Sequence, residues 1–177
     1  MQTYVAFLRG INVGGHHKAP MKELKTLLEK NNYKNILTLL NSGNIILDTE
    51  VASTEKLEHE LTILLESHFQ FPIPTVIRSK EVILAMLASK PFQQVKVHKD
   101  IRLYVSFLYE KLDKSISLKE MEDESFTFVK ITDEELFSVL DLTKSKTTKA
   151  MEKMDKAFNK KLTTRNWNTI EKIGAKL

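Results

Sequence analysis

NILTLLNSGNIILDT, residues 35–49, decides how the first half of this chain folds. Two apolar runs, NILTLL (35–40) and NIILDT (44–49), flank the polar stretch NSGN. Apolar runs of this length bounded by Asn, Ser and Gly predict strands, and the Ser-Gly pair predicts a tight turn between them. The stretch therefore predicts a β-hairpin in the middle of the first eighty residues.

The segments on both sides of the hairpin predict the remaining strands and helices of the first eighty residues. TYVAFLRG (3–10) predicts a strand, and regularly spaced leucines predict helices over about 20–31 and 53–69. PIPTVIRS (72–79) predicts a strand at a sheet edge, because proline withholds a ladder donor. The order β-α-β-β-α-β is the ferredoxin-like plan, in which the first two strands are parallel and the third lies between them.

The second half repeats this order incompletely. The sequence predicts a short helix (80–89), a strand (101–109), a short helix (117–124), a hairpin (126–140) and helices over about 146–160 and 165–175. We therefore predict an α+β protein: a ferredoxin-like (βαββαβ) domain at 1–80, packed with a related α+β domain (βαββαα) at 81–177. No sequence identity between the halves is long enough to prove a duplication.

Composition narrows the class of protein. The 177 residues include no cysteine, which excludes a disulfide framework and a cysteine-based metal site. Neither a secretory signal nor an apolar run of membrane-spanning length is evident. We expect a cytoplasmic protein that does not enter membranes, with its oligomeric state undecided.

Positive charge is concentrated near the C-terminus. Residues 142–177 contain nine lysines and one arginine against three acidic residues, although the whole chain carries only +4. Such asymmetry is typical of a surface for phosphate-bearing partners, but it is equally typical of a solvated helix face. The sequence leaves both interpretations open.

LRGINVGGHHKAP (8–20) joins the first strand to the first helix and holds three of the five glycines. In the ferredoxin-like plan this loop and NSGN leave the sheet at the same end, beside a helix N-terminus that favours negative charge. If the C-terminal helix docks there, it adds an arginine. The residues predicted to bind an anion are Arg9, Gly10, Asn12, Gly14, Gly15, Lys18, Asn41, Ser42, Asn44, Arg165 and Asn166.

A purely structural interpretation of the same residues stands beside this one. Glycines permit tight turns, and asparagines satisfy nearby backbone groups. The order of glycines and lysine fits neither of the common nucleotide-binding signatures. Adjacent His16 and His17 lack converging ligands, so we predict no metal and no cofactor, and two exposed histidines.

Four stretches together carry a resemblance: YVAFLRGINVGG (4–15), PMKEL (20–24), NSGNIIL (41–47) and TTRNWNT (163–169). Over the whole chain the sequence resembles a widespread family of conserved bacterial proteins catalogued as a domain of unknown function. The resemblance implies a two-part α+β fold with a ferredoxin-like first half, and no established activity. At His17 the chain departs from the asparagine usual in that family.

We therefore expect a binding module for a phosphate-bearing or other anionic ligand, either a nucleotide or a nucleic-acid backbone, at the glycine loop. One alternative is a small hydrolase similar to the acylphosphatases, which share the βαββαβ order and use an anion-binding loop and an asparagine after strand two, here Asn41. A third is a protein-interaction or structural protein without small-molecule chemistry. The sequence does not decide whether the chain is an enzyme.

Overall fold

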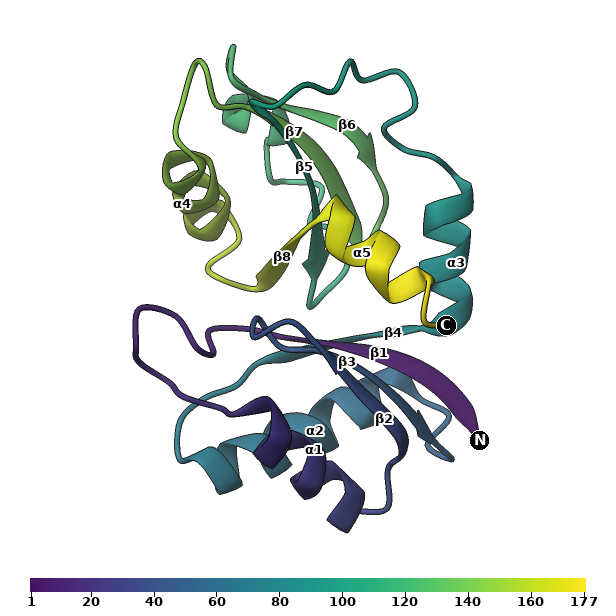
Figure 1. Cartoon of the computed structure of the whole chain (residues 1–177). Coiled ribbons are helices and arrows are strands. Elements are labelled where there is room, and N and C mark those ends of the chain that lie inside the picture. The colour runs from purple at the N-terminus through teal and green to yellow at the C-terminus, as the bar shows by residue number, and fades with distance from the viewer. The chain divides into compact units, whose positions relative to one another are not determined.

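The computed structural model describes residues 1–177, with the side chains of all except Thr147 and Thr148. The chain forms two compact units, shown in Figure 1. Unit 1 contains Met1–Ala85 and the last residues, Ala175–Leu177, and unit 2 contains Met86–Gly174. Among the described residues, no helix has the length and apolar character needed to cross a membrane.

Unit 1 has the predicted ferredoxin-like order. Its elements are β1 (Gln2–Leu8), α1 (Met21–Lys30), β2 (Lys34–Leu39), β3 (Asn44–Thr49), α2 (Thr54–Phe69) and β4 (Thr75–Ser79). The strands pair antiparallel in the order β2-β3-β1-β4, so β1 and β2 run in the same direction with β3 between them. This confirms the predicted class and places β4 at an edge.

One face of this sheet packs against both helices (Figure 1). Alternate residues of β1, including Tyr4 and Leu8, point into this core. The helices contribute the leucines whose spacing predicted them. The leucines of α1 and α2 with no exposed surface are Leu24, Leu28, Leu57, Leu61 and Leu65. Burial of their side chains is what holds helices of ordinary length in place.

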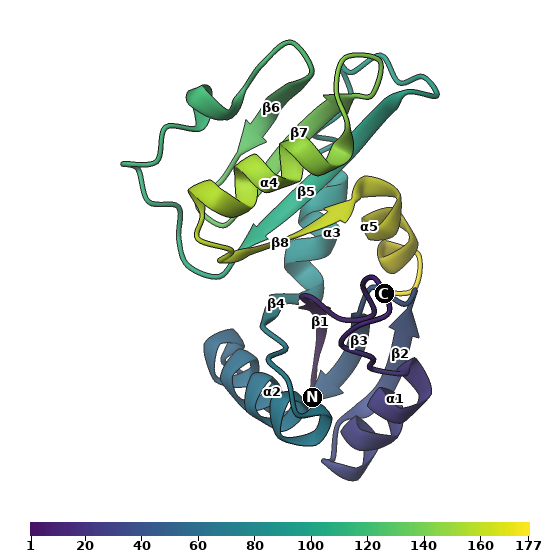
Figure 2. The same ribbon diagram turned by 90° about the vertical axis from the view of Figure 1, so that its left-hand side faces the viewer.

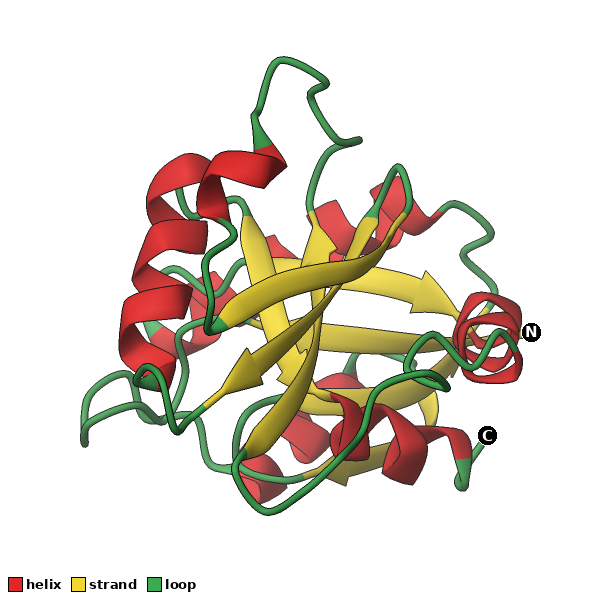
Figure 3. Cartoon of the chain, turned by 90° about the horizontal axis from the view of Figure 1, so that it is seen from above, coloured by secondary structure: helices red, strands yellow, loops and turns green.

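Unit 2 has one more strand than the sequence predicted. Helix α3 (Lys80–Ala88) runs into it, followed by β5 (Ile101–Leu108), a 3-10 helix η1 (Leu118–Met121), β6 (Phe126–Ile131), β7 (Glu135–Asp141), α4 (Thr147–Ala157), β8 (Leu162–Asn166) and α5 (Trp167–Gly174). Their antiparallel sheet has the order β6-β7-β5-β8. Figure 3 shows the helices of the chain in red and its strands in yellow.

The last helix begins at Trp167 and not at Arg165, because residues 162–166 form β8. Thr163 and Thr164 are β-branched, and β5 offers them a free edge with which they pair residue by residue. The predicted order βαββαα for this half is corrected to βαββαβ followed by a helix, with η1 as the first helix.

The two sheets share the same register. Residues 4–8 (YVAFL) and 104–108 (YVSFL) form the central strands β1 and β5. Val5 pairs with Arg78 on β4, and Val105 pairs with Arg165 on β8. Unit 2 is thus a second copy of the unit 1 plan, down to an arginine at the same position of the fourth strand.

Backbone contacts at the strand ends also repeat. The Leu8 amide donates to the Gly43 carbonyl at 2.8 Å, and the Leu108 amide donates to the Glu134 carbonyl at 2.9 Å. In both units, this bond joins the end of the first strand to the turn between the second and third. Equivalent positions in the two units can therefore be compared directly.

Glutamate carboxylates accept hydrogen bonds from backbone amides on two edge strands. The Ile77 amide on β4 donates to Glu58, and the Phe128 amide on β6 donates to Glu122, each at 2.7 Å. An edge amide that already has an acceptor is a poor template for pairing with another chain.

Asp123 organises the turn before β6. Its Oδ1 accepts hydrogen bonds from the amides of Ser125 and Phe126, and its Oδ2 accepts one from Lys153 Nζ at 2.6 Å. The hydrogen bonds from Lys153 and then from Ser125 hold the pKa of the Asp123 carboxyl well below its usual range. The ionised carboxylate therefore stabilises the folded chain.

Asp123→Asn is expected to lower the free energy of unfolding by about 1 kcal/mol at neutral pH, a modest value because the pair is partly exposed. Since the pKa of Asp123 is lower in the folded chain than in the unfolded one, its contribution is complete above the usual pKa near ~4 and is lost as the pH falls further. In urea denaturation, the difference between the two proteins should shrink below about pH 4.

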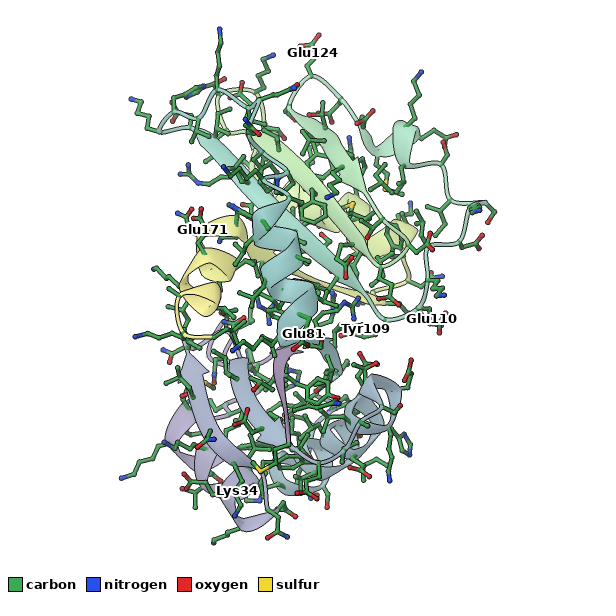
Figure 4. The ribbon with its side chains drawn as sticks, turned by 90° about the vertical axis from the view of Figure 1, so that its right-hand side faces the viewer. Lys34, Glu81, Tyr109, Glu110, Glu124 and Glu171 are labelled. Carbon is green, nitrogen blue, oxygen red and sulfur yellow. The ribbon has the colours of Figure 1, made fainter. Side chains whose placement is uncertain are left out.

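Glu124→Gln, in the same turn (Figure 4), is the matched control. This exposed residue should change the free energy of unfolding by less than about 0.5 kcal/mol. A difference between wild type and Asp123→Asn that stays constant from neutral to acid pH would contradict the assignment.

Candidate functional site

The glycine loop after β1 is built around a tight turn. Gly14 and Gly15 have φ of 58° and 78°, and the His16 amide donates to the Val13 carbonyl at 3.0 Å. Positive φ at both central residues is the type I′ pattern, which glycine adopts without a Cβ clash. These two glycines are therefore explained by the turn, and their predicted role at a ligand stays a prediction.

Asn12 connects this loop to the hairpin turn. Its Nδ2 donates to the carbonyls of Ala19 and Asn41, at 3.0 and 2.9 Å, and its Oδ1 accepts from the Ala19 amide at 2.9 Å. Residues 12 and 41 are far apart in the sequence, so the predicted meeting of the glycine loop and NSGN at one end of the sheet is observed. The side chain itself is fully engaged in holding them together.

The second half of the NSGN turn, Gly43 and Asn44, is buried and tightly packed. Gly43 has φ of 77°, and a Cβ on it would lie 2.8 Å from Leu8 Cβ and from Ile11 Cδ1. The fully buried Asn44 amide donates to the Leu39 carbonyl and to Ser42 Oγ. Asn44 thus fixes the turn from inside, and the surface of the turn is left to Asn41 and Ser42.

The charged members of the predicted site divide between the units. Arg9 and Lys18 belong to the glycine loop of unit 1, where Arg9 is half-buried and Lys18 is exposed. Arg165 and Asn166 belong to β8 of unit 2. The Arg165 guanidinium is buried and donates to Thr163 Oγ1 at 2.8 Å and to the Thr164 carbonyl.

Helix α1 begins directly after the glycine loop. Pro20 is its N-cap residue, and its side chain makes no capping hydrogen bond to the first turn. Such a helix end carries partial positive charge and open donors. Glu23 in the first turn pairs with His68 at 2.8 Å and offsets part of this charge.

The equivalent end of unit 2 has the opposite charge. There the segment after β5 (109–117) contains Glu110 (Figure 4) and Asp113 together with two lysines, and the turn between β6 and β7 contains Asp133 and Glu134, so the two segments carry a net charge of −2. The unit 1 loop and turn contain two cations and no acidic residue over 8–20 and 40–44. One plan therefore carries a basic polar end in unit 1 and an acidic end in unit 2.

Residues 1–137 match one family model, described as "Protein of unknown function (DUF1697)". The chain belongs to this family. The match includes the glycine loop and the NSGN turn, and it ends within β7. TTRNWNT lies beyond the matched residues, so its link to the family stays a prediction.

A solved structure is similar to almost the whole of this family member. It is the conserved bacterial protein SP0830 from Streptococcus pneumoniae, with a TM-score of 0.75 and 24% identity over 98% of this chain and 97% of that chain. At this level of identity the similarity shows a shared fold alone. No curated protein matches the chain.

His17 has a structural role in this family member that the sequence did not indicate. Its ring stacks on Phe71 with centroids 4.7 Å apart, and its Nδ1 lies 3.2 Å from the Gly10 carbonyl. It therefore ties the glycine loop to the segment before β4, at the position where the resemblance implies an asparagine. Among the described residues, no group of three or more histidine or acidic side chains is placed to hold a metal.

An open hollow of about 540 Å³ follows α1 away from the loop. Its lining residues are Pro20, Lys22, Glu23, Thr26, Leu27, Lys30 and His68. The lysines and Glu23 give it mixed charge, so it selects an anion less clearly than the glycine loop does.

Proposed function

We propose that this chain binds a phosphate-bearing or other anionic ligand, such as a nucleotide, at the basic end of the unit 1 sheet. The ligand would lie over the glycine loop and the hairpin turn. The surface residues we assign to it are Arg9, Gly10, Lys18, Asn41 and Ser42, with Asn12 and Asn44 holding the two segments in place.

The Asn12 contacts carry this proposal. They join a loop that bears two cations to a turn that bears an amide and a hydroxyl, all beside the N-terminus of α1. Backbone N–H groups, a helix N-terminus and flexible cations are the groups that proteins use to hold phosphate. The loop is also held before any ligand arrives, which lowers the entropic cost of binding.

The comparison between units gives further support. The same strand ends in unit 2 carry a net negative charge through Asp133 and Glu134, which disfavours an anion, and Glu110 there is already paired with Lys161 at 2.9 Å. A surface that only needed solubility could use either sign of charge. The lack of acidic residues over 8–20 and 40–44 of unit 1 is what an anion site requires.

Lys18→Gln is expected to weaken the binding of ATP by about fivefold to tenfold, because it removes one charge-assisted contact. Binding can be followed from the backbone amide shifts of residues 9–18 and 41–44 in an NMR titration. Lys30→Gln, at the other end of α1, is the control and should leave the affinity unchanged. Shifts confined to residues outside these segments would contradict the proposed site.

The hydrolase alternative makes a different prediction for the same site. If Asn41 orients a water molecule, the protein should release phosphate from an acyl phosphate, and Asn41→Ala should abolish that release. Equal release by both proteins would exclude this alternative.

A further inference from the structure

Helix α4 of unit 2 presents a row of lysines on its outer side. The opposite side packs into the core through Ala150, Met154 and Phe158, which are 4%, 0% and 7% exposed. The helix thus lies against one face of the second sheet (Figure 2). Its apolar side is fully used in holding unit 2 together.

The lysines are spaced four and three residues apart. Lys149, Lys153 and Lys156 fall within an arc of about 60° around the helix axis, because each residue advances by about 100°. Lys146 precedes the helix and Lys160 follows it. We call these five residues the lysine face. From Lys146 to Lys156 it extends about 15 Å, at about 1.5 Å per residue.

Most of this charge is not neutralised within the chain. Lys153 is bound to Asp123 at 2.6 Å. In the part of the chain whose side chains are described, Lys146, Lys149, Lys156 and Lys160 are exposed and form no ion pair. Glu152 borders the face, and Asp155 lies farther around the helix axis from the lysines.

We propose that the lysine face binds the phosphate backbone of nucleic acid without reading its sequence. A row of cations longer than a small ligand matches a polymer that repeats its negative charge. Lysine contacts to phosphate position a protein on nucleic acid, and they carry no base specificity. This inference concerns unit 2 and does not rest on the function proposed for unit 1.

The chemistry of the face favours nucleic acid over other polyanions. Lysine is depleted from protein–protein interfaces, whose energetic centres are aromatic residues and arginine, and the exposed side of α4 offers neither. An amphipathic helix binds membranes by inserting its apolar side, and here that side is buried in the core.

The test measures the binding of a fluorescent mixed-sequence duplex at several salt concentrations by anisotropy. Four contacts predict that log K falls with log salt with a slope near about −3.6, a loss of about a hundredfold between about 50 and 200 mM. Replacing Lys146, Lys149, Lys156 and Lys160 with glutamine should remove most of this slope. Glu152→Gln should strengthen binding by about twofold, because it removes a bordering negative charge.

The control replaces four exposed lysines elsewhere in unit 2, Lys90, Lys96, Lys99 and Lys114, and changes the net charge equally. It should keep the slope of the wild type. Equal loss in both quadruple variants would overturn the proposal, because net charge alone would then explain binding. Binding to anionic vesicles but not to the duplex would overturn it in favour of a membrane. The quadruple variant of the lysine face should show the same ATP-induced amide shifts in unit 1 as the wild type. The two proposals can therefore fail separately.

Discussion

Gly43→Ala is expected to lower the free energy of unfolding of unit 1 by about 4 kcal/mol, the sum of a strained backbone and an overpacked site. At φ of 77°, an alanine is in the left-handed region. Its Cβ would also lie 2.8 Å from Leu8 Cβ and Ile11 Cδ1. Both neighbours are buried, and Leu8 Cβ is attached directly to the central strand, so neither can move away without cost.

Gly14→Ala is the matched control for this prediction. Gly14 also has a positive φ, 58°, but a Cβ there would meet no atom within 4 Å. Its replacement should cost only about 1 kcal/mol, from the backbone alone. Urea denaturation followed by circular dichroism compares the two variants. Equal destabilisation by both would show that Gly43 matters only through its φ.

The hairpin and the helices of unit 1 could be predicted because their signals are local. Turn residues separate two apolar runs in residues 35–49, and leucines mark α1 and α2 at helical spacing. The order of strands and helices along the chain then limits the topology, because a βαββαβ chain has few ways to place its helices on one face of the sheet. The same reasoning predicted that the glycine loop and NSGN meet, which the Asn12 hydrogen bonds confirm.

Strand β8 could not be predicted in this way, because its signal comes from its partner. The five residues LTTRN contain no alternating apolar pattern, and they become a strand by pairing with β5. The repeat of YVAFL as YVSFL was visible in the sequence, and a search for it would have predicted a fourth strand after α4. Tertiary pairing overrides weak local propensity here.

The sequence named the residues of the loop but not their individual roles. It grouped Asn12 and Asn44 with the ligand-binding residues, and both side chains are engaged in hydrogen bonds within the loop and turn. It predicted only that His17 is exposed, and it did not indicate that the ring stacks on Phe71. Such partners are distant in sequence, so residue type alone cannot tell a polar side chain that binds a ligand from one that binds its own backbone.

Asn12→Ala is expected to lower the free energy of unfolding of unit 1 by about 3 kcal/mol. The variant loses three hydrogen bonds and leaves the Ala19 amide, in a fully buried residue, without its acceptor. An unsatisfied buried donor accounts for about 1–3 kcal/mol of this loss. Because φ is 55° at this position, alanine adds backbone strain that asparagine tolerates.

Two further variants separate these causes. Asn12→Gly accepts the positive φ without strain, so its deficit relative to wild type reports mainly the lost side chain. Asn12→Asp retains an acceptor for the Ala19 amide but turns a carboxylate toward the carbonyls of Ala19 and Asn41. We expect it to be no more stable than Asn12→Ala, since two donors are replaced by repulsive oxygens. Hydrogen exchange of the Ala19 amide should accelerate in Asn12→Ala and Asn12→Gly, and an unchanged rate would contradict the role of Asn12 as the connection between the loop and the turn.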